Sequence, residues 1–142
     1  MDWLRHSLAA SSAAIALPLL AGALVVRPHW REGFRERLGS FPGTDPGRVW
    51  VHGASVGEVM AAKGLVYGLQ GEGLRVFGSA TTLAGRELMR RLFPEVPSAM
   101  APLDHPWCVD AALARVRPCS LVLIETELWP SWIAAARREG LP

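Results

Sequence analysis

The chain of 142 residues is long enough for one modest domain and one hydrophobic segment. Half of its residues are apolar and a fifth are charged, which fits a globular fold. The formal net charge of +2 is too small to indicate nucleic-acid binding, so we expect no nucleic-acid partner. Cys108 and Cys119 lack the spacing of metal ligands and lie in apolar sequence, so we expect two reduced, buried thiols.

Residues 7–26 form an uncharged stretch near the N-terminus. A helix of about 20 residues spans roughly 30 Å, the thickness of the hydrocarbon core of a bilayer. Arg5 precedes the stretch and several arginines follow it, which places the C-terminal side in the cytoplasm. We therefore predict a membrane anchor or interfacial helix over residues 1–27. Two alternatives remain open: a cleaved signal peptide with its cleavage site at residues 21–23, and a buried helix of a soluble protein.

Residues 28–47 are predicted to be a basic amphipathic helix followed by a linker. The helix covers residues 30–38, and its arginines could lie against lipid head groups. Gly39 ends the helix, and residues 41–47 form a loop rich in glycine and proline.

From residue 48 onward the sequence repeats one unit, a short apolar strand followed by a helix. This alternation predicts an α/β fold, a Rossmann-like parallel sheet with helices on both faces. The carboxyl ends of the strands then lie along one edge of the sheet, where ligands bind in such folds. The expected strands are 48–52, 74–78, 98–101 and 120–124; the expected helices are 58–70, 84–93, one capped by Asp104 with Pro106 in its first turn, and one from Pro130 to a stop at Gly140.

The first strand runs into His52-Gly53-Ala54-Ser55-Val56-Gly57-Glu58, a turn of small residues that exposes amide groups. Glu58 is expected in the first helical turn, where a carboxylate can accept a proton from an attacking hydroxyl. The alternative is a glutamate that only complements the helix dipole.

Polar residues also follow the second and fourth strands. Thr81 and Thr82 open the helix after the second strand, and simple helix capping is the alternative to a binding role. Glu125 and Glu127 follow the fourth strand with Trp129 close behind, which indicates a polar site with an aromatic wall. A solvated loop is the alternative there. The four histidines are scattered and no glycine-rich nucleotide motif is present, so we expect no metal and no cofactor.

Together these segments resemble a known family, the transferases that attach 3-deoxy-D-manno-octulosonic acid (Kdo) to lipid A precursors. The S-x-G-E and E-T-E-L-W-P motifs, in this order and spacing, are the specific part of the resemblance. The matching pieces are residues 31–39, Val49-Trp50-Val51-His52, Ser55-Val56-Gly57-Glu58, Thr82 with Gly85, Pro102-Leu103-Asp104, and Glu125-Thr126-Glu127-Leu128-Trp129-Pro130. The chain departs from the family pattern at Ala84, Leu103 and Ser131, which affects fine acceptor contacts more than chemistry.

The resemblance implies a glycosyltransferase of GT-B architecture in lipopolysaccharide biosynthesis, on the cytoplasmic face of the inner membrane. Its N-terminal half receives the lipid A precursor, its C-terminal half binds the donor CMP-Kdo, and transfer inverts the anomeric centre without a metal. Glu58 would be the base and Glu125 would stabilise the transition state. The implied substrate-binding residues are Ser55, Gly57, Thr82, Gly85, Glu127 and Trp129.

The resemblance also implies that residues 48–142 are an incomplete N-terminal domain whose donor domain is absent, so we expect this chain alone to be inactive. Two other functions remain open. One is a GT-B transferase with a different acceptor. The other is a non-catalytic, membrane-associated binding module for acidic lipids, with phosphate contacts from Arg27, Arg31, Arg35, Arg37 and Arg86.

Overall fold

The computed structural model describes residues 32–124 and 128–142. The predicted anchor over residues 1–27 lies outside the described residues. No helix within the described ranges combines the length and apolar character needed to cross a membrane.

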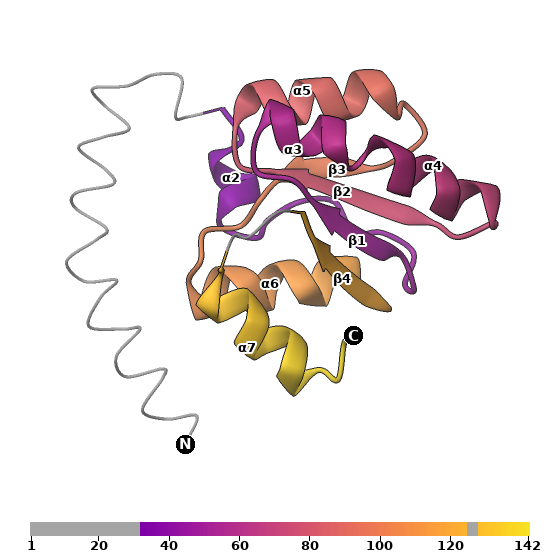
Figure 1. The fold of residues 1–142 in the computed structure, drawn as a ribbon. Coiled ribbons are helices and arrows are strands. Elements are labelled where there is room, and N and C mark those ends of the chain that lie inside the picture. The colour runs from indigo at the N-terminus through magenta and orange to yellow at the C-terminus, as the bar shows by residue number, and fades with distance from the viewer. Residues whose placement is uncertain (1–31, 125–127) are drawn as a thin grey trace.

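A four-stranded sheet forms the centre of the domain (Figure 1). Its strand order is β3-β2-β1-β4, and every neighbouring pair is parallel. The predicted α/β fold with a parallel sheet is therefore confirmed. The strands are β1 (Val49–His52), β2 (Val76–Ala80), β3 (Ser98–Met100) and β4 (Ser120–Leu123).

Helices cover both faces of this sheet, as the strand–helix alternation predicts (Figure 1). On one face lie α3 (Val56–Ala61), α4 (Lys63–Gly71) and α5 (Leu83–Leu92). On the other face lie α6 (Pro106–Val116) and α7 (Pro130–Arg138). The short helix α2 (Phe34–Arg37) lies beside the carboxyl end of the sheet.

Successive residues of β1 divide the hydrophobic core into two parts, because side chains alternate between the faces of a strand. Val49 and Val51 pack with Val59 of α3 and Met89 of α5. Trp50 packs on the opposite side within the cluster that contains Trp132 of α7, at 5.0 Å between ring centroids. Full burial of a large apolar side chain contributes about 1.5–3 kcal/mol, so this alternation fixes which face each helix covers.

Three of the predicted element boundaries are wrong. The second strand is Val76–Ala80 and not 74–78, because pairing starts where Val76 aligns with Val49. The helix after β1 begins at Val56 instead of residue 58, and it divides into α3 and α4 at Ala62. The helix expected over residues 30–38 is seen as the four residues of α2, with residues 30–31 outside the described range.

Two predictions about single residues are also wrong. Asp104 is not the N-cap of α6; His105 holds that position. The Asp104 carboxylate instead accepts a hydrogen bond from the Ser131 N–H at 2.8 Å, in the first turn of α7. Cys119 is exposed at the start of β4, whereas Cys108 is buried as expected, and burial raises the pKa of the Cys108 thiol.

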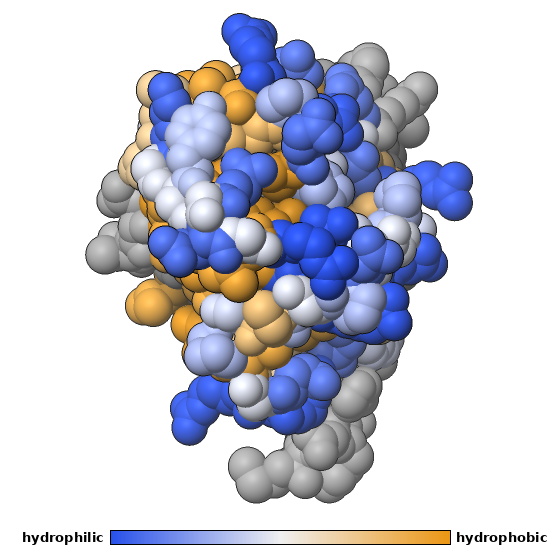
Figure 2. Space-filling model, turned by 90° about the vertical axis from the view of Figure 1, so that its right-hand side faces the viewer, coloured by the Kyte–Doolittle hydropathy of each residue, from blue (hydrophilic) through white to orange (hydrophobic). Residues whose placement is uncertain are grey.

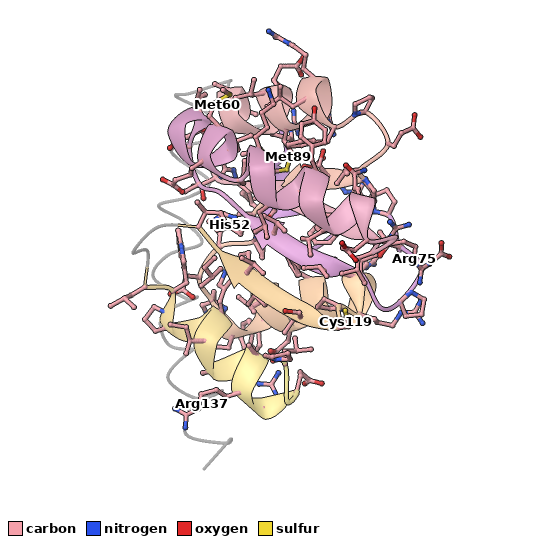
Figure 3. All side chains as sticks on the ribbon, turned by 45° about the vertical axis from the view of Figure 1, so that its right-hand side comes forward. His52, Met60, Arg75, Met89, Cys119 and Arg137 are labelled. Carbon is pink, nitrogen blue, oxygen red and sulfur yellow. The ribbon has the colours of Figure 1, made fainter. Side chains whose placement is uncertain are left out.

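The two ends of the sheet differ in what surrounds them. Arg75 lies at the amino end of the strands and His52 at the carboxyl end (Figure 3). Figure 2 faces the amino end, where hydrophilic side chains cover much of the surface and apolar ones show between them. At the carboxyl end, the chain leaves β1 toward β2 on one side, and β4 lies on the other side of β1. This change of direction between β1 and β4 is where ligands bind in open α/β sheets.

Candidate functional site

The turn after β1 holds Glu58 at the carboxyl edge of the sheet. Ser55 is the N-cap of α3, and Glu58 stands in the first turn of the helix, where the sequence predicts it. Its half-buried carboxylate accepts the Ala54 N–H at 2.5 Å through Oε2 and the Ser55 hydroxyl at 3.1 Å through Oε1. These contacts close the turn, as a capping carboxylate does, and they leave a further lone pair on each oxygen.

The same turn, Gly53-Ala54-Ser55-Val56-Gly57, matches the G-x-S-x-G pattern of serine hydrolases. That pattern alone does not separate a hydrolase from a transferase. In the structure the Ser55 hydroxyl donates to Glu58, while the nearby His52 directs Nδ1 at Ser79. Ser55 also has an ordinary extended backbone, with φ −122° and ψ 175°. The arrangement therefore lacks the serine–histidine contact of a nucleophile site.

The turn after β2 lies directly against the turn after β1. The N–H groups of Thr81 and Thr82 both donate to the Ala54 carbonyl at 3.0 Å. Thr82 is the N-cap of α5 and accepts the Gly85 N–H through Oγ1, so its capping role is confirmed. Gly85 is buried, and a Cβ at this position would lie 3.3 Å from the Ser55 backbone carbon and 2.9 Å from Thr82 Oγ1. Gly85 is therefore required for the close approach of the two turns.

The structure brings Ser55, Glu58, Thr82 and Gly85 together at one edge, but it gives Gly57 no comparable packing role. Gly57 is exposed, and a Cβ there would meet nothing nearer than Ser55 Oγ at 3.8 Å. Packing against the described residues therefore does not require glycine at position 57.

Ile124 and Trp129, which follow β4 in sequence, border the same edge. Glu125 and Glu127 lie outside the described residues. Ile124, immediately before Glu125 in sequence, donates its N–H to the His52 carbonyl at 2.9 Å. The Trp129 ring meets the His52 ring edge to face at 5.9 Å. The chain thus leaves and re-enters the described structure beside the end of β1.

A buried histidine lies beneath these turns, and sequence analysis did not identify its role. His52 is 1% exposed, and its Nδ1 lies 3.0 Å from the Ser79 hydroxyl, which also accepts the Trp50 indole N–H at 2.8 Å. Because the indole can only donate, the Ser79 proton is directed to Nδ1 and the ring proton is assigned to Nε2. Burial lowers the pKa of His52 to about 4, against smaller opposing effects of the Ser79 backbone and of the Glu58 charge. The sequence signal was a polar residue in each of two adjacent buried strands.

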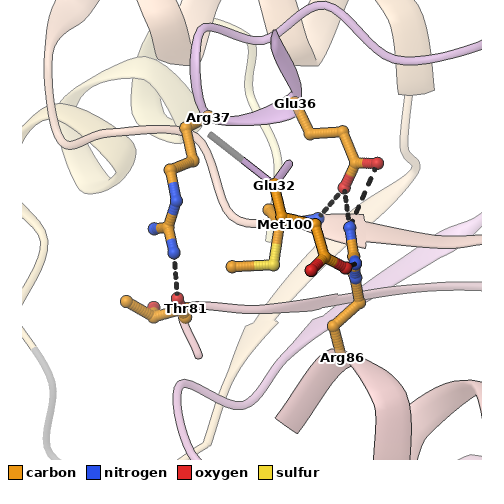
Figure 4. Close-up of polar contacts among 6 residues, drawn as sticks. All are labelled: Glu32, Glu36, Arg37, Thr81, Arg86 and Met100. Carbon is orange, nitrogen blue, oxygen red and sulfur yellow. Dashed lines mark hydrogen bonds and ion pairs between the residues drawn. The ribbon is translucent and has the colours of Figure 1, made fainter. Parts of the chain in front are cut away.

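The suggestion that Arg86 contacts a ligand phosphate is wrong. Arg86 is buried and its guanidinium is bound by two carboxylates, from Glu32 at 2.6 Å and from Glu36 at 3.2 Å (Figure 4). The Glu36 carboxylate also accepts the Met100 N–H at 2.6 Å. We refer to Glu32, Glu36, Arg86 and the Met100 amide as the α2 clasp, because these contacts hold α2 against the sheet. Among residues 32–124 and 128–142, no three His, Cys, Asp or Glu side chains are grouped so that they could hold a metal ion.

Comparison with known proteins identifies the family. A sequence model of the 3-deoxy-D-manno-octulosonic acid transferase family, covering its N-terminal part, matches residues 32–142. The chain belongs to the Kdo transferase family. The match includes the whole sheet and all the turns described above, so the strand ends of this Kdo transferase domain hold the residues quoted for the resemblance.

Curated relatives from distant organisms agree with this assignment. The 3-deoxy-D-manno-octulosonic acid transferase of Bordetella pertussis is 41% identical over 100 residues, which cover 66% of this chain and 23% of that protein. The Haemophilus influenzae transferase is 34% identical over 128 residues, which cover 85% of this chain and 30% of that protein. A probable mitochondrial transferase of Arabidopsis thaliana is 33% identical over 91 residues, 62% of this chain and 20% of that protein. The chain thus spans less than a third of each of these relatives.

Proposed function

We propose that this chain supplies the acceptor side of an enzyme that transfers Kdo from CMP-Kdo to a lipid A precursor in lipopolysaccharide biosynthesis. Membership of the Kdo transferase family supports the transfer of Kdo in general terms. The inverting course, the absence of a metal, the GT-B partner half that binds CMP-Kdo and the lipid A acceptor are further parts of the proposal. So is the location on the cytoplasmic face of the inner membrane.

The observation that carries the proposal is the position of Glu58 beside the β1–β4 change of direction. Its carboxylate is half-buried, it bonds to Ala54, whose carbonyl contacts the turn that opens α5, and each oxygen keeps a lone pair for an incoming hydroxyl. An acceptor hydroxyl hydrogen-bonded to this carboxylate would lose its proton to Glu58 as its oxygen attacks the anomeric carbon of Kdo. The leaving CMP would depart from the opposite face of that carbon, which inverts the centre.

The remaining predicted residues take supporting roles in this proposal. Ser55 and the Ala54 amide orient the Glu58 carboxylate. Thr82 and Gly85 shape the neighbouring wall on which the acceptor sugar rests, with Gly57 exposed at its rim. Glu125, with Glu127 and Trp129 in the same segment, would stabilise positive charge that develops on Kdo in the transition state.

The test is transfer of Kdo by an enzyme of the relatives' full length that carries this chain as its N-terminal part. Glu58→Gln keeps the shape of the side chain and an oxygen for the Ala54 N–H but removes the base. General base catalysis contributes about 10²- to 10⁴-fold, so kcat is expected to fall at least about 100-fold with little change in acceptor affinity.

Glu72→Gln is the matched control, because it removes the same charge from an exposed site at the far end of α4. Its activity should equal that of the unchanged enzyme. Full activity in the Glu58→Gln enzyme would remove Glu58 from the mechanism.

A further inference from the structure

The α2 clasp fixes the orientation of the helix that carries Arg37. Glu36, the residue before Arg37, bonds both to Arg86 and to the Met100 N–H at the end of β3. The carbonyl of Arg37 itself accepts the Leu103 N–H at 2.8 Å. The backbone of Arg37 is thus held on both sides, and its side chain extends to Thr81 at the carboxyl edge of the sheet (Figure 4).

At that edge the Arg37 guanidinium meets one hydrogen-bond acceptor among residues 32–124 and 128–142. Its Nη2 donates to the Thr81 carbonyl at 2.8 Å, immediately after the last residue of β2. A guanidinium has five N–H donors, so most of its hydrogen-bonding capacity is unused in the described structure. Burial, with the positive charge of Arg86 nearby, lowers the pKa of Arg37.

In the described part of the chain, Arg37 lacks the carboxylate partners that Arg86 and Arg138 have. Arg86 has two carboxylate partners, and Arg138 is paired with Asp110 at 2.7 Å. For Arg37 no carboxylate lies within ion-pair distance in residues 32–124 and 128–142. A guanidinium that has lost part of its hydration without gaining an anion is costly, and an arriving oxyanion would offset that cost.

A short path of hydrogen bonds also connects Arg37 to Glu58, the proposed base. Thr81, which it contacts, donates to the Ala54 carbonyl, and the Ala54 N–H donates to the Glu58 carboxylate. The first turn of α5 begins two residues after Thr81. A helix of this length leaves its first N–H groups without intrahelical acceptors, and Thr82 covers only that of Gly85.

We propose that Arg37 binds an oxyanion group of the acceptor, a phosphate or a carboxylate attached to a sugar, and so holds the acceptor hydroxyl beside Glu58. The planar fork of the guanidinium suits two oxygens of one such group. The inference rests on the proposed function for the identity of the acceptor as an acidic sugar. Its test measures binding and not turnover, so it can fail or succeed independently of Glu58.

The experiment is equilibrium binding of small sugars to the 142-residue chain, followed by calorimetry or by amide NMR shifts. The probes are N-acetylglucosamine 1-phosphate, glucuronate and uncharged N-acetylglucosamine. We expect at least one anionic probe to bind and the uncharged sugar to bind at least tenfold more weakly. Preference between the two anions identifies the group as phosphate or carboxylate. Shifts should be largest at the amides of residues 81–85.

Arg37→Met should weaken the anionic probe at least tenfold, and Arg37→Lys should weaken it less because the charge remains. Arg90→Met is the matched control: it removes the same charge from an exposed position in the last turn of α5 and should leave affinity unchanged. Equal losses in Arg90→Met and Arg37→Met would overturn the proposal, because they would indicate an unspecific charge effect. Undiminished binding by Arg37→Met, or no anion binding by the unchanged chain, would overturn it too. If Arg37→Met does not fold, two measurements replace it: anion affinity should fall in Arg37→Lys, and the amide shifts of the unchanged chain should be largest at residues 81–85. Failure of both would overturn the proposal.

Discussion

His52 shows how one buried side chain at the strand end makes stability depend on pH. Its folded-state pKa of about 4 is below the ordinary value of 6.5, so between these values the unfolded chain binds a proton that the folded chain does not. The free energy of unfolding should therefore fall as pH is lowered from 6.5 to 4, by up to about 3 kcal/mol from this residue. The fall should be complete only below the folded-state pKa.

The measurement is urea unfolding at several pH values for the unchanged chain and for His52→Asn, whose amide oxygen can still accept from Ser79. The variant should show the shallower slope between pH 6.5 and 4.5. Parallel slopes would show that His52 does not remain neutral in the folded protein.

Gly39 is a second residue whose role follows from local geometry alone. Its φ is +78°, and a Cβ would lie 2.4 Å from the Cys108 carbonyl in the first turn of α6. Left-handed backbone costs an alanine about 1–2 kcal/mol and overpacking about 1–3 kcal/mol more. Gly39→Ala should therefore lower the free energy of unfolding by about 2–5 kcal/mol.

Gly43→Ala provides the comparison, because a Cβ there meets nothing within 4 Å and φ is not positive. Thermal or urea unfolding should show almost no change for this variant. If Gly39→Ala lost as little unfolding free energy as Gly43→Ala, the clash at Gly39 would be relieved by movement of α2.

At the scale of elements, the α2 clasp predicts unequal contributions from its two glutamates. Glu36 is the more buried, contacts Arg86 and also accepts the Met100 N–H, whereas Glu32 is 63% exposed. Glu36→Ala leaves the Met100 N–H without its acceptor and leaves the buried Arg86 guanidinium with the exposed Glu32 carboxylate in place of two carboxylates. It should therefore cost about 3 kcal/mol in unfolding free energy. Glu32→Ala should cost at most about 1 kcal/mol, since water screens its charge. Equal effects would mean that Arg86 is less buried in solution than in the structure.

The order and type of the elements were predictable from residue 48 onward, but several of their ends were not. Apolar runs such as 120–124 and the stop at Gly140 are local signals, and they indicated a strand and a helix end correctly. The start of β2 depends on which residue pairs with Val49, and the partner of Asp104 is an amide 27 residues away in α7. Local patterns do not contain such long-range pairings.

The same distinction applies to the candidate site. The turns containing Glu58 and Thr82 could be placed at one edge because parallel strands align their carboxyl ends. Their direct contact through Gly85, the His52–Ser79–Trp50 contacts and the carboxylate partners of Arg86 could not be predicted. Each depends on the packing of side chains from strands or helices that are distant in sequence.

At the scale of the whole molecule, the parts of the candidate site rest on elements of different stability. β1 and β2 are each paired on both sides and their residues are buried, whereas all four residues of β4 are only partly buried. β4 pairs with β1 on one side, and on the other the Leu121 N–H donates to the carbonyl of Pro142. The turns after β1 and β2, with Glu58 and Thr82, therefore follow the two central strands of the sheet, whereas Ile124 follows an edge strand that is only partly buried.

Amide hydrogen exchange tests this gradient directly. Opening that frees β4 need not disturb β1, because it breaks fewer buried apolar contacts. The Leu121 amide should therefore exchange at least about tenfold faster than amides of Val51 and Phe77, which corresponds to a difference of about 1.4 kcal/mol in opening free energy. Equal protection would show that the sheet opens as one unit, without a separate opening of β4.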